Sequence, residues 1–271
     1  MNLAVVGHVE WCEFLRVEEF PAAGAIVHAD ERWEEPGGGG AVAAAELARL
    51  AGACTFFTGL GEDELGERAR ARLSDLGVTV HAAPTDEPTR RAIVHVDAHA
   101  ERTITVLGRK LVPRGRSPAL PWHQLEGMDG VYFVSGDADA ARLARAARVM
   151  VATPRELETL RAAAVELDAL VGSGDDDGER YRPGDLDPPP RLVVATAGAL
   201  GGWAQPGGPY RPVPLEGELE DAYGCGDSFA AGLTYALADG RELDDALAFA
   251  AAVGASALTR RGALGRDTPK A

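Results

Sequence analysis

Short apolar runs alternate along most of this chain with longer segments of helical periodicity. Each apolar run is only a few residues long and is followed by a glycine or a polar turn, which is typical of strands buried on both faces. The predicted strands cover residues 3–6, 54–58, 131–134, 148–152, 169–172 and 192–196. The predicted helices cover residues 41–51, 63–76, 154–167, 228–237 and 243–259.

Two patches of short strands interrupt this rhythm, at about residues 14–35 and 90–108. The alternation elsewhere predicts an α/β fold, in which helices cover both faces of a mostly parallel sheet. The two patches would form a small β-lid. Because ligands in such folds bind beyond the carboxyl ends of the strands, we expect the glycine-rich turns after the strands to line one crevice.

The composition limits the class of protein. The 271 residues suit a single domain over residues 1–271. The net charge of −15 argues against a nucleic acid or an anionic membrane as partner, but it does not exclude a nucleotide ligand. The three cysteines have no metal-ligand spacing, and no signal peptide or membrane-spanning run is visible, so we expect reduced thiols in a cytoplasmic protein.

Residues 221–232 carry the clearest chemistry, with the sequence Asp-Ala-Tyr-Gly-Cys-Gly-Asp-Ser-Phe-Ala-Ala-Gly. The turn Gly224-Cys225-Gly226 lets backbone N–H groups converge, and the helix that follows adds the positive end of its dipole. A phosphoryl group could sit there while Asp227 takes a proton from an attacking hydroxyl. The alternative is that Asp227 is a plain helix N-cap.

Three other glycine-rich turns are candidates for ligand contact. Gly37–Gly40 lets backbone approach a ligand at the start of a helix, although it also suits a flexible loop. Thr196, Gly198 and Gly201 end a strand and could hold nucleotide phosphates, or could form a tight hairpin turn before Trp203. The turn at residues 58–66 is better explained by helix capping through Asp63.

Taken in order, these motifs resemble the PfkB, or ribokinase-like, carbohydrate kinase family over nearly the whole chain. Residues 221–227 are similar to its signature Asp-Thr-x-Gly-Ala-Gly-Asp, and Gly37–Gly40 to its N-terminal Gly-Gly signature. The segment 59–66 matches Gly-x-Gly-x-Asp-x-x-Gly, Thr196-x-Gly-x-x-Gly resembles the ATP-phosphate turn, and residues 257–263 look like its closing run.

The resemblance implies a three-layer αβα sandwich with a β-lid, and transfer of the γ-phosphoryl of ATP to an alcohol with Mg²⁺ as cofactor. It implies that Asp227 is the base and that the backbone of Gly224, Cys225 and Gly226 forms the anion hole. It places ATP at Thr196, Gly198 and Gly201. Asp221 matches a position associated with a monovalent cation, which the replacement of the signature Thr by Ala222 puts in doubt.

This chain departs from the family at the positions that bind the substrate. Glu10 and Cys12 stand where sugar kinases often carry Asn and Asp, Val42 replaces an Asn, and Gly39 replaces a Lys. We therefore expect an acceptor other than plain ribose, bound by Glu10, Cys12, Val42 and the backbone of Gly38, Gly39 and Gly40.

The metal-linked Asn-x-x-Glu motif is absent as such. Ser173-Gly-Asp-Asp176 is the nearest match and makes Asp176 a candidate metal ligand, with residues 155–158 as a second candidate. Acidic runs in glycine-rich loops such as this are also commonly just solvated.

The leading hypothesis is an ATP-dependent kinase for a hydroxyl of a sugar, a sugar derivative or a nucleoside. Arg90, Arg91 and Arg102 on the lid could meet an anionic substrate, or could simply be solvated. The alternative function is a non-catalytic ligand-binding or regulatory relative of the same fold. The lid, as a small sheet with a face and edges to cover, is also a candidate surface for a homodimer.

Overall fold

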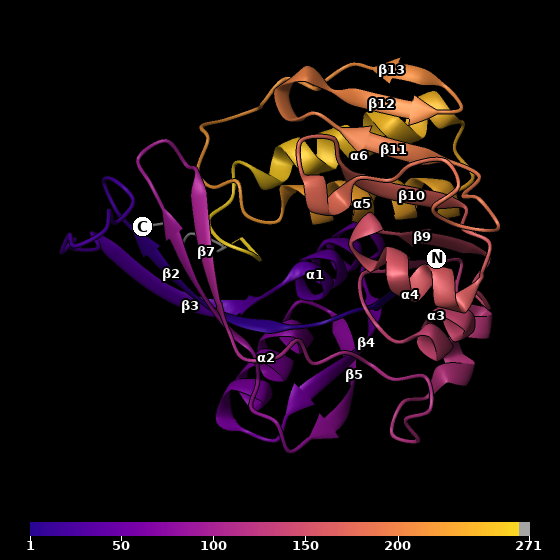
Figure 1. Ribbon diagram of the computed structural model, residues 1–271, viewed down its shortest axis with the longest axis horizontal. Coiled ribbons are helices and arrows are strands. Elements are labelled where there is room, and N and C mark those ends of the chain that lie inside the picture. Colours follow the sequence, from indigo (N-terminus) through magenta and orange to yellow (C-terminus); the bar gives the residue numbers. More distant parts are fainter. Residues whose placement is uncertain (266–271) are drawn as a thin grey trace.

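A computed structural model describes residues 1–265 and consists of a large sheet with helices on both faces and a smaller sheet at one end (Figure 1). The large sheet has nine strands in the order β13-β12-β11-β10-β9-β8-β1-β4-β5. Its parallel strands are β1 (Leu3–Val6), β4 (Cys54–Gly61), β5 (Val78–Thr85), β8 (Gly130–Phe133), β9 (Val149–Ala152), β10 (Ala169–Ser173) and β11 (Val193–Thr196). Two antiparallel strands, β12 (Gly202–Gln205) and β13 (Gly208–Tyr210), complete one edge.

Successive side chains of β1 enter different cores, because neighbouring residues of a strand face opposite sides of the sheet. Leu3 and Val5 pack with the helices α1 (Gly39–Ala51), α2 (Glu64–Asp75), α5 (Cys225–Ala238) and α6 (Leu243–Ala257). Ala4 and Val6 pack with α3 (Ala138–Ala144), α4 (Leu157–Ala163) and the 3-10 helix η1 (Trp122–Gly127). The apolar runs of the sequence are therefore buried on both faces. Within residues 1–265 no helix is long and apolar enough to cross a bilayer.

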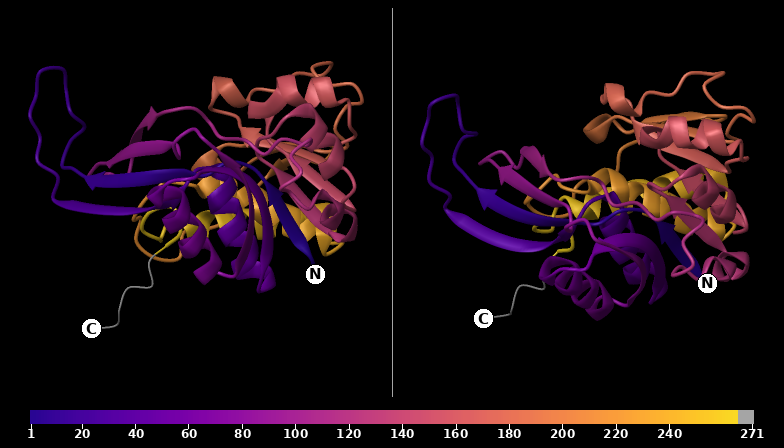
Figure 2. Two further views of the ribbon diagram at one scale, coloured as in Figure 1. Left: turned by 90° about the horizontal axis from the view of Figure 1, so that it is seen from below. Right: turned by 60° about the horizontal axis from the view of Figure 1, so that its bottom comes forward.

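The smaller sheet is the lid, with strand order β3-β2-β6-β7. Its strands are β2 (Glu10–Arg16), β3 (Glu31–Gly37), β6 (Arg91–Val96) and β7 (Arg102–Leu107). One face packs on Tyr223 and Val42 through a core that includes Cys12, Phe14 and Trp33. Figure 2 shows the lid and the loop between β2 and β3 extending to one side of the body.

Helix α5 runs so that its first turn lies at the carboxyl ends of the parallel strands. Gly130, the first residue of β8, lies against Ala238 and Thr234 near the end of the helix. The N-terminus of α5, with Asp227, must then lie near the other end of β8, where β1, β9 and β10 also finish. The fold thus brings the glycine turns and Asp227 to one edge, as expected for ligand sites in such sheets.

Several elements differ from the expectation. In the first of the two lid patches the strands cover Glu10–Arg16 and Glu31–Gly37, with no strand between residues 17 and 30. The helix expected over 154–167 is a 3-10 turn, Pro154–Glu156, followed by a helix that stops at Ala163, because Ala164 adopts a left-handed conformation with φ of 52°. The strands β5, β12 and β13 and the helix α3 were not predicted.

Candidate active site

The glycine turn before α1 lies directly under Asp227. An added Cβ at Gly39 would be 2.6 Å from Asp227 Oδ1 and 3.0 Å from Val134. A Cβ at Gly40 would be 2.5 Å from the carbonyl oxygen of His8, and Gly38 has a φ of 81°. The turn therefore has no room for side chains, because protein atoms pack against its backbone.

Asp227 is the third residue of α5 and does not cap the helix. The N-cap is Gly224, with a φ of 73°, and no side chain bonds to the first turn. The first N–H groups of a helix have no carbonyl acceptor of their own, so those of Cys225 and Gly226 are free to face an anion. A Cβ on Gly226 would meet nothing within 4 Å, which shows open space above this turn. The N-cap alternative is wrong.

Burial and the negative charge of Glu179 raise the pKa of Asp227 to about 6 from an ordinary 3.8. A carboxylate with such a pKa is a better proton acceptor than an exposed one and is still ionised at neutral pH. The geometry and the pKa together suit a general base.

His8 follows β1 and is largely buried at the carboxyl edge of the sheet. The imidazole Nδ1 lies 3.0 Å from Ser135 Oγ. Burial lowers the pKa of His8 to about 3, so the ring is neutral. Three positive charges add to this effect: those of Lys110, Arg90 and Arg155.

Glu10 lies between His8 and Arg90. Its Oε1 is 3.7 Å from His8 Nε2 and 3.2 Å from Arg90 Nε. Burial raises the pKa of Glu10, and Arg90 and Lys110 oppose that rise. The Arg90 Nε–H is buried and finds no hydrogen-bond acceptor within residues 1–265, because the contact with Glu10 is poorly aligned.

The two other cations are held by carboxylates. Lys110 Nζ lies 2.9 Å from Glu156 Oε1. Arg155 contacts Glu179 Oε1 at 2.6 Å through its Nε, and its Nη2 pairs with Asp176. Glu179, which the sequence groups with the acidic run that contains Asp176, also accepts the Ser173 N–H at 2.7 Å.

The expected metal residues lie in two separate places. Asp176 lies on the loop after β10, where Glu179 offers a second carboxylate. Asp221 is fully buried, and its two oxygens accept the N–H groups of Tyr223 at 2.8 Å and Gly262 at 3.1 Å. A cation at Asp221 would have to compete with those donors. Within residues 1–265 no group of three or more His, Cys, Asp or Glu forms a metal cluster.

The expected nucleotide turn follows β11. Thr196, Gly198 and Gly201 form a short 3-10 turn that leads into β12, so the run is also a hairpin turn. Gly201 has a φ of 88° and lies against the backbone of Tyr210, which leaves no room for a side chain. Gly198 is exposed and meets nothing within 4 Å, so its backbone is open to a ligand.

Two of the expected substrate residues lie beneath the site. Cys12 and Val42 are buried in the lid core with Tyr223. Cys12 Sγ is 3.4 Å from Tyr223 Oη, which accepts the Gly38 N–H at 2.8 Å. Val42 lies under Gly224, where a Cβ would come within 2.8 Å of it. Both positions connect the glycine turn to the run that carries Asp227.

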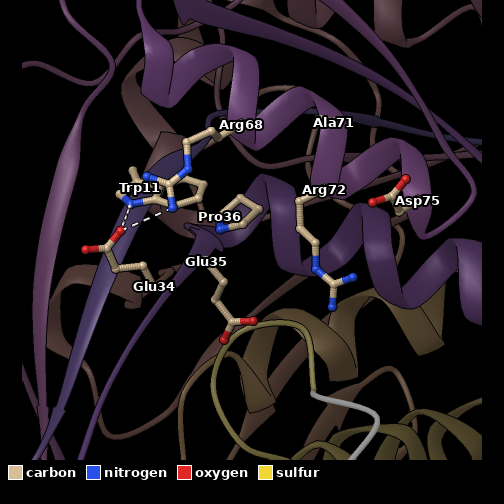
Figure 3. A pocket seen from close by; sticks show the side chains of 8 residues that line it. All are labelled: Trp11, Glu34, Glu35, Pro36, Arg68, Ala71, Arg72 and Asp75. Carbon is tan, nitrogen blue, oxygen red and sulfur yellow. Dashed lines mark hydrogen bonds and ion pairs between the residues drawn. The ribbon is translucent and has the colours of Figure 1, made fainter.

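A separate hollow of about 420 Å³ lies outside this site, between the lid and α2 (Figure 3). The residues that line it contact one another. The Arg68 guanidinium lies 4.3 Å from the centroid of the Trp11 ring and 3.3 Å from Glu34. The hollow lies where the lid meets the body of the molecule. It contains none of the expected site residues and is lined by Trp11, Glu34, Glu35, Pro36, Arg68, Ala71, Arg72 and Asp75.

A buried carboxylate with a raised pKa, a helix N-terminus and a glycine turn lie together at the carboxyl edge of a parallel sheet, an arrangement that suits phosphoryl transfer. The model of the pfkB family of carbohydrate kinases matches residues 1–118 and 134–271, and the chain belongs to this family. It is thus a kinase of the ribokinase-like fold.

The chain is 30% identical to the ATP-dependent ribose-1-phosphate kinase of Halopiger xanaduensis, over 98% of this chain and 94% of that protein. Among solved structures, ribokinase of Thermotoga maritima has a TM-score of 0.76 at 21% identity and covers 97% of this chain and 95% of its own. Ribokinase of Arabidopsis thaliana, solved with ribose and ATP, has a TM-score of 0.73 at 21% identity and covers 97% and 94%.

Proposed function

We propose that this kinase transfers the γ-phosphoryl group of ATP to a hydroxyl of a phosphorylated pentose, with ribose 1-phosphate as the first candidate. The observation that carries the proposal is the buried Nε–H of Arg90, which has no acceptor, together with the charges of Arg90, Lys110 and Arg155, all of which act on His8. A protein with a net charge of −15 that gathers three cations at its ligand site favours an anionic ligand. The name of the Halopiger relative agrees with this chemistry.

The substrate phosphate would bind near Arg90 and Lys110. The buried Nε–H of Arg90 lacks an acceptor, and a phosphate oxygen would supply one. Lys110 would give up its ion pair with Glu156 and bind the phosphate instead. Glu10 would accept a sugar hydroxyl, and the backbone of Gly38–Gly40 would form the floor of the site.

The acceptor hydroxyl would lie against Asp227, and its oxygen would face the N-terminus of α5. Asp227 takes the hydroxyl proton as the oxygen forms a bond to the γ-phosphorus. The bond from that phosphorus to the β-phosphate oxygen breaks, and ADP leaves. The N–H groups of Gly224, Cys225 and Gly226 face the charge on the transferring group. In ribose 1-phosphate the primary hydroxyl at C5 is the least hindered acceptor.

A Mg²⁺ ion held mainly by phosphates and water usually takes only one or two carboxylates from the protein, and Asp176 and Glu179 are the candidates, each of which would exchange its contact with Arg155 for the ion. When bound, the ion would neutralise charge on the phosphates of ATP. ATP would lie toward Thr196, Gly198 and Gly201, where the backbone is open.

ADP release should be measured with ribose 1-phosphate, ribose, ribose 5-phosphate and a panel of nucleosides. We expect kcat/KM for ribose 1-phosphate to exceed that for ribose by roughly 10²-fold or more, because ribose cannot make the one or two charged hydrogen bonds that the phosphate would make. Equal values for the two sugars would refute the phosphate site. Ligand-induced thermal stabilisation without ADP release on any acceptor would favour a binding protein instead.

A further inference from the structure

The side chains of His8 and Glu10 lie next to each other against the glycine turn that forms the floor of the site. A Cβ on Gly38 would lie 3.2 Å from His8 Cδ2 and 3.1 Å from Glu10 Cγ, so both side chains border the same residue of the turn. His8 Nε2 and Glu10 Oε1 are 3.7 Å apart, which is too far for a direct hydrogen bond. The two polar groups therefore face each other without being bonded.

Ser135 determines which nitrogen of His8 carries the proton. Ser135 is fully buried, and its Oγ lies 3.0 Å from His8 Nδ1. Within residues 1–265 this hydroxyl has no other hydrogen-bond partner. Because buried hydroxyl groups are nearly always paired, the Ser135 O–H donates to Nδ1. The neutral imidazole then carries its proton on Nε2, and His8 presents an N–H donor on the side of Glu10.

Glu10 is the matching acceptor. Its side chain is mostly buried, with the whole residue 7% exposed, and its carboxylate accepts no hydrogen bond in the part of the chain that the structure describes. A desolvated carboxylate without donors is unfavourable, and so is an unpaired imidazole N–H. A hydroxyl oxygen between the two would accept from His8 and donate to Glu10, and hydroxyl groups are able to do both.

We propose that His8 and Glu10 together bind the C2 hydroxyl of the pentose, so that His8 is a specificity-determining residue that selects ribose 1-phosphate over 2-deoxyribose 1-phosphate. The proposal rests on the proposed function, which places the substrate phosphate at Arg90. Glu10 Oε1 is 3.2 Å from Arg90 Nε, so a hydroxyl at Glu10 belongs to the carbon next to the one that carries the phosphate. In ribose 1-phosphate that carbon is C2, and the C5 hydroxyl remains for Asp227.

The first test compares ribose 1-phosphate with 2-deoxyribose 1-phosphate on the wild-type protein and needs no variant. We expect kcat/KM for ribose 1-phosphate to be higher by roughly 10²-fold or more, because the deoxy sugar leaves a buried N–H and a buried carboxylate unpaired. Equal values, or a preference for the deoxy sugar, would overturn the inference and leave the proposed function intact. A wild-type protein that phosphorylates neither sugar overturns both.

The second test assigns the preference to His8 with two variants that differ in the reach of one amide group. The Asn side chain is short and can replace Nδ1 toward Ser135, whereas the longer Gln side chain can bring its N–H near the place of Nε2. His8→Asn should lower kcat/KM for ribose 1-phosphate by about 10–100-fold and change that for the deoxy sugar by less than about threefold. His8→Gln should recover part of the loss.

His81→Asn is the matched control, because His81 lies on the edge strand β5 and contacts Gln124 Oε1 at 3.1 Å, away from the site. It should stay within about twofold of wild type on both sugars. Dissociation constants measured without ATP give a second readout, in which His8→Asn weakens ribose 1-phosphate and leaves the deoxy sugar unchanged. Equal losses on both sugars in His8→Asn would overturn the inference by showing a structural role. An unchanged preference in that variant would overturn it as well.

Discussion

The carboxylate of Asp227 lies against the backbone of Gly39, so closely that one added methyl group at residue 39 would be 2.6 Å from Oδ1. These residues are far apart in the sequence and come from the start of two different helices, α1 and α5. Their contact joins the two glycine signatures into one site. The Gly39 position must therefore stay without a side chain for the Asp227 carboxylate to keep its place.

Gly39→Ala should displace Asp227 and lower kcat/KM by roughly 10²-fold or more, because small misplacements of catalytic groups have large effects on rate. Gly127→Ala is the matched control, since a Cβ at that glycine meets nothing within 4 Å and its φ is not positive. Steady-state ADP release on both variants checks the expectation. Full activity in Gly39→Ala would contradict the close contact.

Much of the fold could be predicted, because its strands are apolar runs that fill both cores. The misses have local causes. β5 alternates Val78 and Val80 with polar residues and contains Pro84 next to its last residue, so it lacks a continuous apolar run. The helix after β9 stops at Ala163, and no glycine or proline there indicates a helix end in the sequence.

The site was predictable only where one stretch of sequence carries the chemistry. Asp227 and its glycine turn form such a stretch, and Asp63 does cap α2 by accepting the Gly66 N–H at 2.8 Å. The cation cluster is different, because Arg90, Lys110 and Arg155 come from three separate connections and only the fold brings them together. His8 was missed, although its place just after a buried strand was a usable signal.

The raised pKa of Asp227 predicts a pH dependence of the reaction. The carboxylate must be ionised to accept the hydroxyl proton, so kcat/KM should rise with pH through about 6 and level off above it. Asp227→Asn should lose at least about 10³-fold in kcat and still bind ATP. A pH profile that is flat from 5 to 8 at saturating ATP would contradict the assignment of Asp227 as base.

The same pKa shift predicts that the base destabilises the fold. The unfolded carboxyl titrates near 3.8 and the folded one near 6, so the folded state holds more protons between these values. Stability should therefore fall as the pH rises from about 4 to about 6. Asp227→Asn should remove this penalty and raise the free energy of unfolding at pH 7 by about 1–3 kcal/mol. Urea denaturation at pH 4.5 and 7 measures both effects, and a destabilised Asn variant at pH 7 would refute them.

Lys110 and Arg90 should govern the preference for a phosphorylated substrate. Lys110→Met removes the charge while keeping much of the side-chain length, and Arg90→Met removes the buried Nε–H donor. Each should lower kcat/KM for ribose 1-phosphate by about 10–100-fold while changing that for ribose little. Lys110→Arg serves as the charge-conserving control. Equal losses on both sugars would show a general structural role in place of phosphate recognition.

Gly262 should be essential for the link between the lid and the segment of residues 221–224 that leads into α5. Its N–H donates to Asp221, the next N–H, from Ala263, donates to Glu35 Oε1 at 2.8 Å, and its own φ is 69°. A Cβ there would collide with the carboxylate of Glu35 and with the indole nitrogen of Trp33.

Gly262→Ala should therefore cost roughly 2–4 kcal/mol of unfolding free energy, from backbone strain and overpacking together. Gly52→Ala separates the two contributions, because Gly52 has a φ of 85° but open space around it. That control should lose only about 1–2 kcal/mol. Urea denaturation of both variants measures the difference, and equal losses would show that the Glu35 carboxylate moves aside without cost.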